Sequence, residues 1–249
     1  MIKILPKIVV INPPTLPEAM AKTLLAARNC YASFDKASEN ADIKLIQHLI
    51  DKGHTSVLEQ WGINYVLITN RGVHNEDVRQ RTGISHAVQS SRYCNFSGDT
   101  FGKSIRVIDT LFFKNTQYGY RTWEHAMEVA EEAYLSLLRD GASAQEAREV
   151  LPLSLAVSDV QYANCTGLRY RFNQRCAKTA HPEFRRLMLP FLLWCAKKYP
   201  PFFIDLERKF EIEYDRFEML YGFNSFASVL EYEGDPTKMD NLQYLNEEG

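Results

Sequence analysis

The sequence carries no excess of positive charge. Its 249 residues include 29 Lys and Arg against 31 Asp and Glu, which gives a formal net charge of −2 and an isoelectric point near 6.3. Proteins that bind along a DNA or RNA backbone usually present a strongly basic face. The charge balance therefore argues against a nucleic-acid polymer as partner, whereas a small anionic ligand needs only a local group of cations.

Cysteine is scarce, and long apolar runs are absent. The five cysteines are scattered and form no C-x-x-C pair, which argues against a disulfide framework or a structural zinc site and favours a reducing cytoplasm. The apolar run at 8–11 is too short for a signal peptide, and no stretch approaches the ~18 residues of a membrane span. We therefore expect a cytoplasmic protein that contacts no membrane.

Several catalytic and cofactor motifs are also missing. The sequence contains no G-x-G-x-x-G, no Walker loop and no G-x-S-x-G. A nucleotide cofactor would therefore need an arrangement other than the Rossmann type, and a serine nucleophile is not expected. Four histidines fit no metal-ligand spacing, so no metal site is expected: His74, His86, His125 and His181.

The patterns that are present predict one α+β domain without internal repeats. Predicted strands lie at 3–11, 62–69, 91–97, 105–110 and 157–163. Predicted helices lie at 15–29, 42–52, 73–81, 122–138, 144–150, 166–177 and 182–198. From residue 231 the chain has six carboxylates against one lysine, so we expect a domain at 1–230 and a loose acidic tail at 231–249.

The segment 78–93 concentrates cations and hydroxyl groups with almost no acid. It holds three arginines, four Ser or Thr residues and one His. Guanidinium groups beside hydroxyls are suited to gripping phosphate, and 90–93 has the composition of a phosphate cradle. The alternative is a solvated charged surface, in which Arg79 and Arg81 pair with the acids at 76–77.

A second group of arginines lies far downstream, at Arg148, Arg169, Arg171 and Arg175. On a helix over 166–177, Arg171 and Arg175 form an i,i+4 pair of like charge, which is unfavourable unless an anion lies nearby. Arg175 also shares a face with apolar residues, and a desolvated guanidinium needs a partner. That partner is either a protein carboxylate or an oxygen of a bound substrate.

A shorter polar segment begins at His54, directly after the helix stop at Gly53. Helix N-termini bind anions, so a pyrophosphate at this point is one interpretation. The other is structural, because Ser56 followed three residues later by Glu59 has the pattern of a capping box.

These segments, in this order, resemble the signature motifs of the flavin-dependent thymidylate synthases. The family's R-H-R, followed after about seven residues by S and then R-Y, is similar to Arg79-Gln80-Arg81 and Ser90-Ser91-Arg92-Tyr93. Four further matches are Ala27–Tyr31 with A-R-x-[CS]-[YF], Gly53–Glu59 with G-H-x-S-x-x-E, Ala147–Pro152 with A-R-x-x-L-P, and Asn164–Arg175 with N-x-R-x-L-x-N-x-x-x-x-R. The resemblance spans roughly residues 20–190.

The resemblance implies a single domain with a central, mostly antiparallel sheet flanked by helices, assembled as a homotetramer with active sites at subunit interfaces. It also implies an enzyme in which FAD takes hydride from NADPH and the one-carbon unit of methylenetetrahydrofolate passes to carbon 5 of dUMP, giving dTMP. No protein nucleophile takes part, which agrees with the scattered cysteines.

The same resemblance assigns roles by position. The substrate-binding residues would be Glu76, Arg79, Ser90, Ser91, Arg92, Arg148 and Arg175. Of these, Ser90, Ser91, Arg92 and Arg148 would hold the nucleotide phosphate, and Arg79 and Arg175 would stabilise negative charge on the pyrimidine. The flavin-binding residues would be Cys30, His54, Ser56, Glu59, Gln80, Arg81, Asn164, Thr166 and Tyr170.

The chain departs from the family pattern near both ligands. Gln80 replaces the signature histidine, and Ala87 and Val88 stand where Asn and Glu are usual. Thr166 and Tyr170 replace an arginine and an asparagine on the flavin side. Lost hydrogen-bond partners are what a changed nucleotide preference requires. UMP or dCMP as substrate, or transfer of a hydroxymethyl group, therefore stays open beside dUMP.

Two hypotheses come from other classes of protein. A non-catalytic nucleotide- or RNA-binding module would use the arginines together with Tyr93, Tyr170 and Phe172 as stacking groups. A purely structural protein would leave four arginines far apart in the fold: Arg79, Arg92, Arg148 and Arg175.

Overall fold

The structure, a computed structural model, describes residues 1–36, 39–116 and 118–239. Its centre is a five-stranded sheet in the order β4 (Ile84–Val88), β6 (Ala156–Asn164), β3 (Gly62–Asn70), β2 (Lys7–Ile11) and β7 (Ser228–Tyr232). The pairs β4–β6, β6–β3 and β3–β2 are antiparallel, and β2–β7 is parallel. The predicted α+β class with a mostly antiparallel sheet is confirmed.

Three helices cover one face of this sheet: α6 (Cys165–Arg175), α7 (Pro182–Lys198) and α8 (Pro200–Tyr221). Tyr65 of β3 packs edge-on against Phe191 of α7, which in turn contacts Phe172 of α6. These rings belong to the main apolar core, whose residues alternate along β3 because successive strand side chains point to opposite faces. The helices therefore fix where the end of α6 lies relative to the sheet.

The opposite face of the sheet is covered only in part. Val9, Val66 and Ile68 pack beneath a second, two-stranded parallel sheet made of β1 (Ile2–Ile4) and β5 (Arg106–Ile108). Val160 and Tyr162 of β6 lie on this face beyond that cover and are 37% and 39% exposed.

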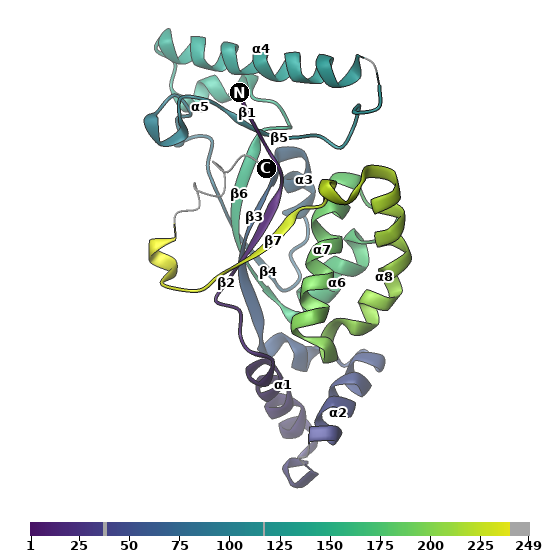
Figure 1. Cartoon of the computed structure of the whole chain (residues 1–249). Coiled ribbons are helices and arrows are strands. Elements are labelled where there is room, and N and C mark those ends of the chain that lie inside the picture. The colour runs from purple at the N-terminus through teal and green to yellow at the C-terminus, as the bar shows by residue number, and fades with distance from the viewer. Residues whose placement is uncertain (37–38, 117, 240–249) are drawn as a thin grey trace.

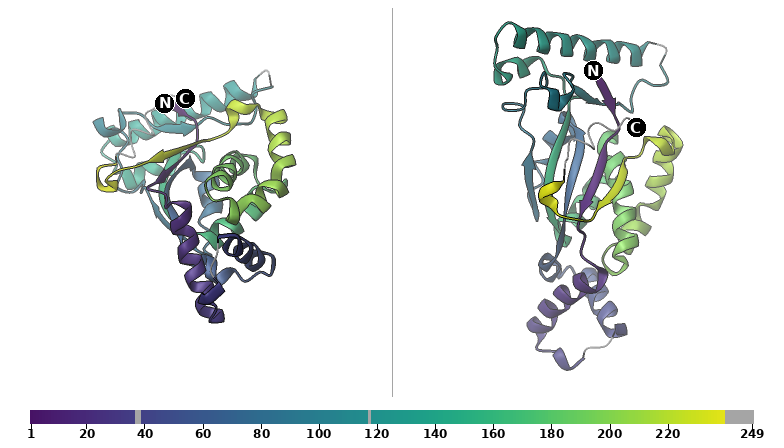
Figure 2. Two further views of the ribbon diagram at one scale, coloured as in Figure 1. Left: turned by 60° about the horizontal axis from the view of Figure 1, so that its bottom comes forward. Right: turned by 60° about the vertical axis from the view of Figure 1, so that its left-hand side comes forward.

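The remaining helices form the two ends of the molecule. At one end lie α4 (Gly119–Arg139) and α5 (Ala144–Ala147), and at the other lie α1 (Leu16–Tyr31) and α2 (Glu39–Asp51), as the views in Figures 1 and 2 agree. Short 3-10 helices add 34–36, 55–60, 99–101, 148–150, 223–225 and 236–238. Among the residues described, no helix is both long and apolar enough to cross a membrane.

Three predicted elements were wrong in part. The strand predicted at 3–11 is divided into β1 and β2 around Pro6, which has no N–H to donate to a ladder. The stretch 91–97 forms turns instead of a strand, because the side chain of Asn95 accepts hydrogen bonds from the backbone and hydroxyl of Ser97. The helix predicted at 73–81 is α3 (Arg71–Asp77), so the triplet at 79–81 lies beyond its end.

Three elements were not anticipated: β4, α8 and β7. The last of these runs across residue 231, where the acidic composition begins. Beyond it, Asn12 and Gly234 exchange two hydrogen bonds of 2.8 and 3.0 Å. The final ten residues of the predicted acidic tail, 240–249, lie outside the described residues.

Candidate active site

A basic cavity lies beside the first turn of α3. Its volume is about 280 Å³, and its lining includes Arg71 and Asn75 of α3, Ser91, and Arg148 at the end of α5. Asn70 caps α3 by accepting a hydrogen bond of 2.7 Å from the backbone of Val73, which fixes the helix start and the position of Arg71. Two residues predicted to bind phosphate, Ser91 and Arg148, are thus brought together.

Arg71 was missed by the sequence prediction. Burial lowers the pKa of its guanidinium below the ordinary value, and the like charge of Arg148 lowers this pKa further. Its Nη2 donates to the backbone oxygen of Gln89 at 3.1 Å, and the acid nearest Arg148 is the exposed Glu149, 4.0 Å away. Two guanidinium groups line this cavity together with one carboxylate, that of Glu149, so it is a candidate binding site for an anion.

Ser90 and Arg92 lie on the turn that leads away from β4. The hydroxyl of Ser90 accepts a hydrogen bond of 3.2 Å from the backbone N–H of Arg92. The Arg92 side chain is exposed, donates through Nε to Gln145 of α5 at 2.9 Å and lies over the ring of Tyr93. Both arginines predicted to bind phosphate therefore lie beside α5.

The downstream arginines of α6 find protein carboxylates. Nη1 of Arg175 donates to Oε2 of Glu76 at 3.0 Å, and its guanidinium lies over the ring of Phe184. One turn earlier on the helix, Arg171 forms an ion pair with Asp77, with Nη2 and Oδ1 2.9 Å apart. The acids at 76–77 thus form ion pairs with arginines of α6. The alternative, in which these acids pair with Arg79 and Arg81, is not what the structure shows.

A second cavity adjoins Glu76 on the other side of α3. It measures about 390 Å³ and is walled by Phe112, Phe113, Trp123 and His181, with Gly72 and Glu76 at its edge. Arg71 and Asn75 line the basic cavity, Gly72 and Glu76 line this one, and Leu153 lines both, so the cationic and the largely aromatic cavity are neighbours along α3.

The signature triplet has an unusual set of environments. Arg79 and Arg81 are exposed and have no carboxylate partner among the residues that the structure describes. Gln80 between them is 4% exposed, and neither its amide nitrogen nor its amide oxygen has a hydrogen-bond partner. Buried amides without partners are rare because desolvation is costly, so the Gln80 amide is a candidate for hydrogen bonding to a ligand.

The loop after the triplet packs closely against the start of α6. Asn164 caps this helix by accepting from the backbone of Gly167 at 2.8 Å, and its own backbone donates to the oxygen of Gly83. A Cβ added to Gly167 would lie 2.7 Å from the backbone oxygen of Thr82. Glycine at 167 is therefore what permits the close approach, and Gly83 itself adopts a left-handed φ of +65°.

Most of the predicted flavin residues lie around the 3-10 helix at 55–60. Nδ1 of His54 lies 3.1 Å from the hydroxyl of Tyr31, and Thr166 donates to the backbone oxygen of Thr55 at 2.7 Å. His54 precedes this helix but makes no side-chain capping bond. The capping-box interpretation of Ser56 and Glu59 is therefore wrong, because these exposed residues lie within the 3-10 helix.

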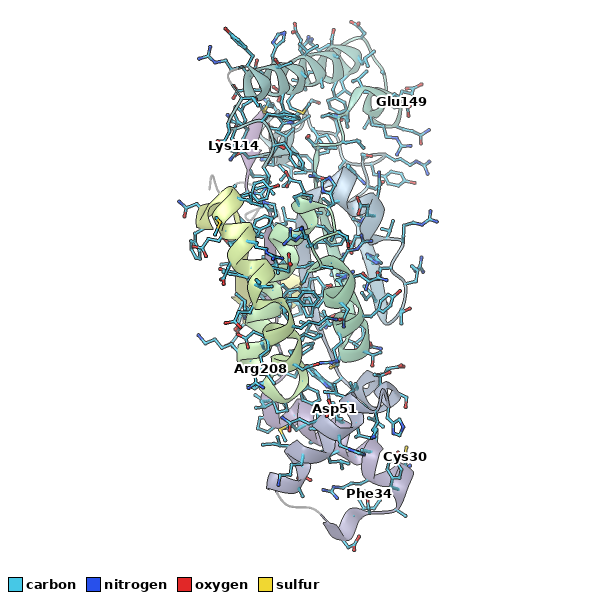
Figure 3. All side chains as sticks on the ribbon, turned by 90° about the vertical axis from the view of Figure 1, so that its right-hand side faces the viewer. Cys30, Phe34, Asp51, Lys114, Glu149 and Arg208 are labelled. Carbon is cyan, nitrogen blue, oxygen red and sulfur yellow. The ribbon has the colours of Figure 1, made fainter. Side chains whose placement is uncertain are left out.

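Two further flavin candidates are exposed near the same end of the molecule. Cys30 lies in the last turn of α1, and Tyr170 on α6 is 45% exposed with its hydroxyl accepting from Gln174. Figure 3 shows Cys30 and Glu149, the neighbour of Arg148, toward opposite ends of the folded molecule. Within one subunit, the predicted phosphate-binding residues and most of the predicted flavin-binding residues thus lie at different ends of the molecule.

Comparison with known proteins shows the family of this chain. The family profile described as "Thymidylate synthase complementing protein" matches residues 14–201. The flavin-dependent thymidylate synthase of Geobacter sulfurreducens is 32% identical over 196 residues, which cover 76% of this chain and 82% of that protein. A probable flavin-dependent thymidylate synthase of Mycobacterium phage D29 is 31% identical over 177 residues, covering 65% and 72%.

A solved structure shares the fold. The crystal structure of the UMP/dUMP methylase PolB from Streptomyces cacaoi, bound with 5-Br dUMP, superposes with a TM-score of 0.67 at 20% identity and covers 82% of this chain and 96% of that one. With the ordered motifs and the extent of the sequence matches, the conclusion follows that this chain belongs to the flavin-dependent thymidylate synthase family.

Proposed function

We propose that this protein transfers a one-carbon unit from methylenetetrahydrofolate to carbon 5 of a pyrimidine mononucleotide, with FAD as cofactor and NADPH as reductant. The observation that supports the proposal is the cavity lined by two arginines, Arg71 and Arg148, and one acid, Glu149, in a chain of this family. A nucleotide phosphate supplies the charge that this cavity lacks. Ser90, Ser91 and Arg92 would complete the phosphate contacts.

The base would bind at Glu76 and Arg175, which meet beside α3. A uracil ring offers one N–H donor next to a carbonyl acceptor, so a carboxylate and a guanidinium held together match that edge. Cytosine has a lone pair where uracil has this N–H, and the carboxylate would repel it. The pair therefore favours dUMP or UMP over dCMP. Arg175 and the free Arg79 would stabilise negative charge that develops on the base oxygens.

The residues around 55–60 and the signature triplet fit a flavin nucleotide. Arg81 offers an unpaired cation to a pyrophosphate, and Gln80 offers an amide without partners to the hydrogen-bonding edge of a ring. His54, Ser56, Glu59, Asn164, Thr166, Tyr170 and Cys30 would line the remainder of the site. When bound, the flavin supplies the reducing equivalents that convert the transferred unit to a methyl group.

The division of these residues between two ends of the chain favours an assembly. A second copy would bring its flavin end to the phosphate end of the first, which is the arrangement expected of a homotetramer with active sites at subunit interfaces. The uncovered part of the sheet, with Val160 and Tyr162 exposed on β6, offers an apolar surface for such contacts.

UMP is the substrate that a specific observation favours beside dUMP. Ala87 and Val88 are exposed on the edge strand β4, directly before the phosphate-binding turn, and neither carries a polar group that would select against a ribose hydroxyl. Discrimination at that position requires a side chain that can reject or bind the hydroxyl. We therefore include UMP as the alternative nucleotide.

The test is release of tritium from carbon 5 of the labelled nucleotide. Protein saturated with FAD, NADPH and methylenetetrahydrofolate should release tritium from dUMP or UMP, and much more slowly from dCMP. Mass spectrometry of the product distinguishes a methyl from a hydroxymethyl group. A protein that binds no flavin, or releases no tritium from any of the three, would refute the proposal and would favour the non-catalytic binding module.

A further inference from the structure

A network of buried polar side chains lies behind the candidate site, with Asp159 of β6 at its centre. The Asp159 side chain is fully buried and accepts four hydrogen bonds. Its Oδ2 accepts from Nδ1 of His86 at 2.8 Å, from Nε2 of His74 at 3.2 Å and from Gln161 at 2.8 Å. Its Oδ1 accepts from the backbone N–H of Ala87 at 2.9 Å. One carboxylate thus joins α3, β4 and β6.

Gln161 extends this network to α6 and β3. Its Nε2 also donates to Oδ2 of Asp77 at 2.7 Å, and its Oε1 accepts from the hydroxyl of Tyr65 and from Nη1 of Arg171, each at 2.7 Å. Asp77 and Arg171 form the ion pair at 2.9 Å, and both are fully buried. The network therefore joins α3, β3, β4, β6 and α6 through buried side chains.

Burying such a network costs free energy, because its charged and polar groups lose their contacts with water. Asp77 and Asp159 bring two negative charges and Arg171 one positive charge, so one negative charge remains unless His74 or His86 holds a proton. Buried ion pairs of this kind often contribute no more stability than well-packed apolar residues would. Stability alone therefore does not account for the network, and the elements that it connects indicate its role.

The network is adjacent to the side chains that would contact the nucleotide. Asp77 follows Glu76 directly, and Arg171 precedes Arg175 by one helical turn, so the buried ion pair lies beside the half-exposed Glu76–Arg175 pair. On β4, the residues held by Asp159 come directly before the turn with Ser90 and Ser91.

We propose that His74, Asp77, His86, Asp159 and Arg171 are positioning residues, which fix Arg175 and the phosphate-binding turn in the geometry that the nucleotide requires. The proposal rests on the proposed function. It assigns these five residues no contact with substrate or flavin. Their effect is expected on nucleotide binding and on the productive orientation of the base, because a misplacement of about 1 Å can cost up to ~100-fold in rate.

Three side chains of the network, those of His74, His86 and Asp159, could also be considered as metal ligands. One potential ligand atom of each lies within 4.8 Å of the other two. However, Nε2 of His86 is buried without a hydrogen-bond partner, whereas a metal-bound histidine almost always donates its second N–H to an acceptor. Oδ2 of Asp159 is moreover occupied by the Gln161 amide. These contacts favour the hydrogen-bonded network.

The experiment replaces the buried ion pair by apolar residues of similar size. The double variant Asp77→Leu/Arg171→Met should remain folded, since such replacements are often neutral for stability. A matched control exists in α7 and α8, where Arg185 and Glu213 form another buried ion pair at 2.9 Å that is not part of the Asp159 network. Its counterpart is Arg185→Met/Glu213→Leu. Thermal midpoints and flavin absorbance are recorded for both.

We expect Asp77→Leu/Arg171→Met to lower kcat/KM for the nucleotide by roughly 10- to 100-fold, with the KM for methylenetetrahydrofolate and flavin binding nearly unchanged. The control double variant should retain wild-type values. The single variant Arg171→Lys keeps a positive charge beside Asp77, so it should lose less kcat/KM than Asp77→Leu/Arg171→Met. Equal kinetics in the two double variants would overturn the inference while leaving the proposed function intact. A divalent metal bound one per chain in the wild type and lost in Asp159→Asn would overturn it as well. Absence of nucleotide turnover in the wild type itself would instead refute the proposed function.

Discussion

At the scale of single residues, the arginines differ by whether a carboxylate already neutralises them. Arg171 and Arg175 have acids at 2.9 and 3.0 Å, whereas Arg79 and Arg81 have none among the described residues, and Arg71 and Arg148 share a cavity. The sequence predicted which segments hold the arginines, but not which acid each one meets. That depends on a contact between α3 and α6 across 94 to 99 positions of sequence, which no local pattern encodes.

Arg148→Gln tests the phosphate cavity. Loss of a charge-assisted hydrogen bond costs about 1.5–3 kcal/mol, so the KM for the nucleotide should rise by roughly 10- to 100-fold. The effect should be small when the corresponding nucleoside is offered at high concentration, because that ligand has no phosphate. Initial-rate kinetics with both ligands measure this. Arg208→Gln, an exposed arginine on α8, is the control and should leave KM unchanged.

Glu76→Gln tests the recognition of the base. A glutamine side chain keeps an acceptor for the N–H of uracil and adds an N–H donor that can meet the ring nitrogen of cytosine. The ratio of kcat/KM for dUMP to that for dCMP should therefore fall by about tenfold, the value of one neutral hydrogen bond. A competition assay with both nucleotides reads the ratio directly. An unchanged ratio would show that Glu76 does not contact the base.

At the scale of elements, strongly periodic segments were predictable and segments with mixed composition were not. The helix predicted at 182–198 has the observed bounds of α7, and the helix predicted at 15–29 is α1, with Thr15 as its N-cap. The strand β4 was missed because Ile84-Ser85-His86-Ala87-Val88 shows little apolar alternation. Its inward side chain His86 is polar, and Nδ1 of this side chain is hydrogen-bonded to Asp159, a partner 73 positions away. The shortened α3 has the same origin, since Asp77 at its end turns inward to Arg171.

The pH dependence of stability tests the Asp159 network. Burial alone would raise the pKa of the Asp159 carboxyl, but hydrogen bonds from His74, His86 and Gln161 hold this pKa well below its ordinary value. A carboxyl whose pKa is lower in the folded chain stabilises the fold above its unfolded pKa of about 3.9, and this stability is lost as the pH falls through the folded value.

We therefore expect the free energy of unfolding to decrease between roughly pH 5 and pH 3, and to decrease less steeply in Asp159→Asn. Urea titrations followed by circular dichroism at several pH values give the two slopes. Asp235, an exposed carboxyl in the 3-10 helix region at 236–238, supplies a control. Asp235→Asn should leave most of the steepness in place. A wild-type slope in Asp159→Asn would mean that other carboxyls account for the acid lability.

At the scale of the whole molecule, the candidate site is distributed along an elongated chain. Cys30 and His54 belong to the end formed by α1 and α2, and Arg148 belongs to the end formed by α4 and α5 (Figure 1). The sequence motifs indicated the candidate site residues and the family. Their order along the chain contains no information on which surfaces of two subunits would come into contact. In the proposed assembly, subunit contacts would form on surfaces such as the uncovered part of β6, where Val160 and Tyr162 are exposed.

Val160→Lys tests the assembly. A lysine on this sheet face would place a charge in an apolar contact between copies, and an unpaired charge at the core of an interface is strongly unfavourable. Light scattering after size exclusion should show a wild-type species heavier than the 28.7 kDa chain and a smaller species for the variant, with loss of flavin absorbance. Met219→Lys, at an 85% exposed apolar residue on α8, should change neither. A wild type that remains a single chain yet holds flavin would contradict the shared site.

The central claim is that the chain delivers one carbon to carbon 5 of a uracil mononucleotide. It is tested most directly by mass spectrometry of the nucleotide recovered after a single turnover with isotopically labelled methylenetetrahydrofolate and reduced FAD. The account predicts that the label appears on carbon 5 of dUMP or UMP as a methyl group and is absent from dCMP. Recovery of all three nucleotides without the label, from protein that has bound both flavin and nucleotide, would contradict it.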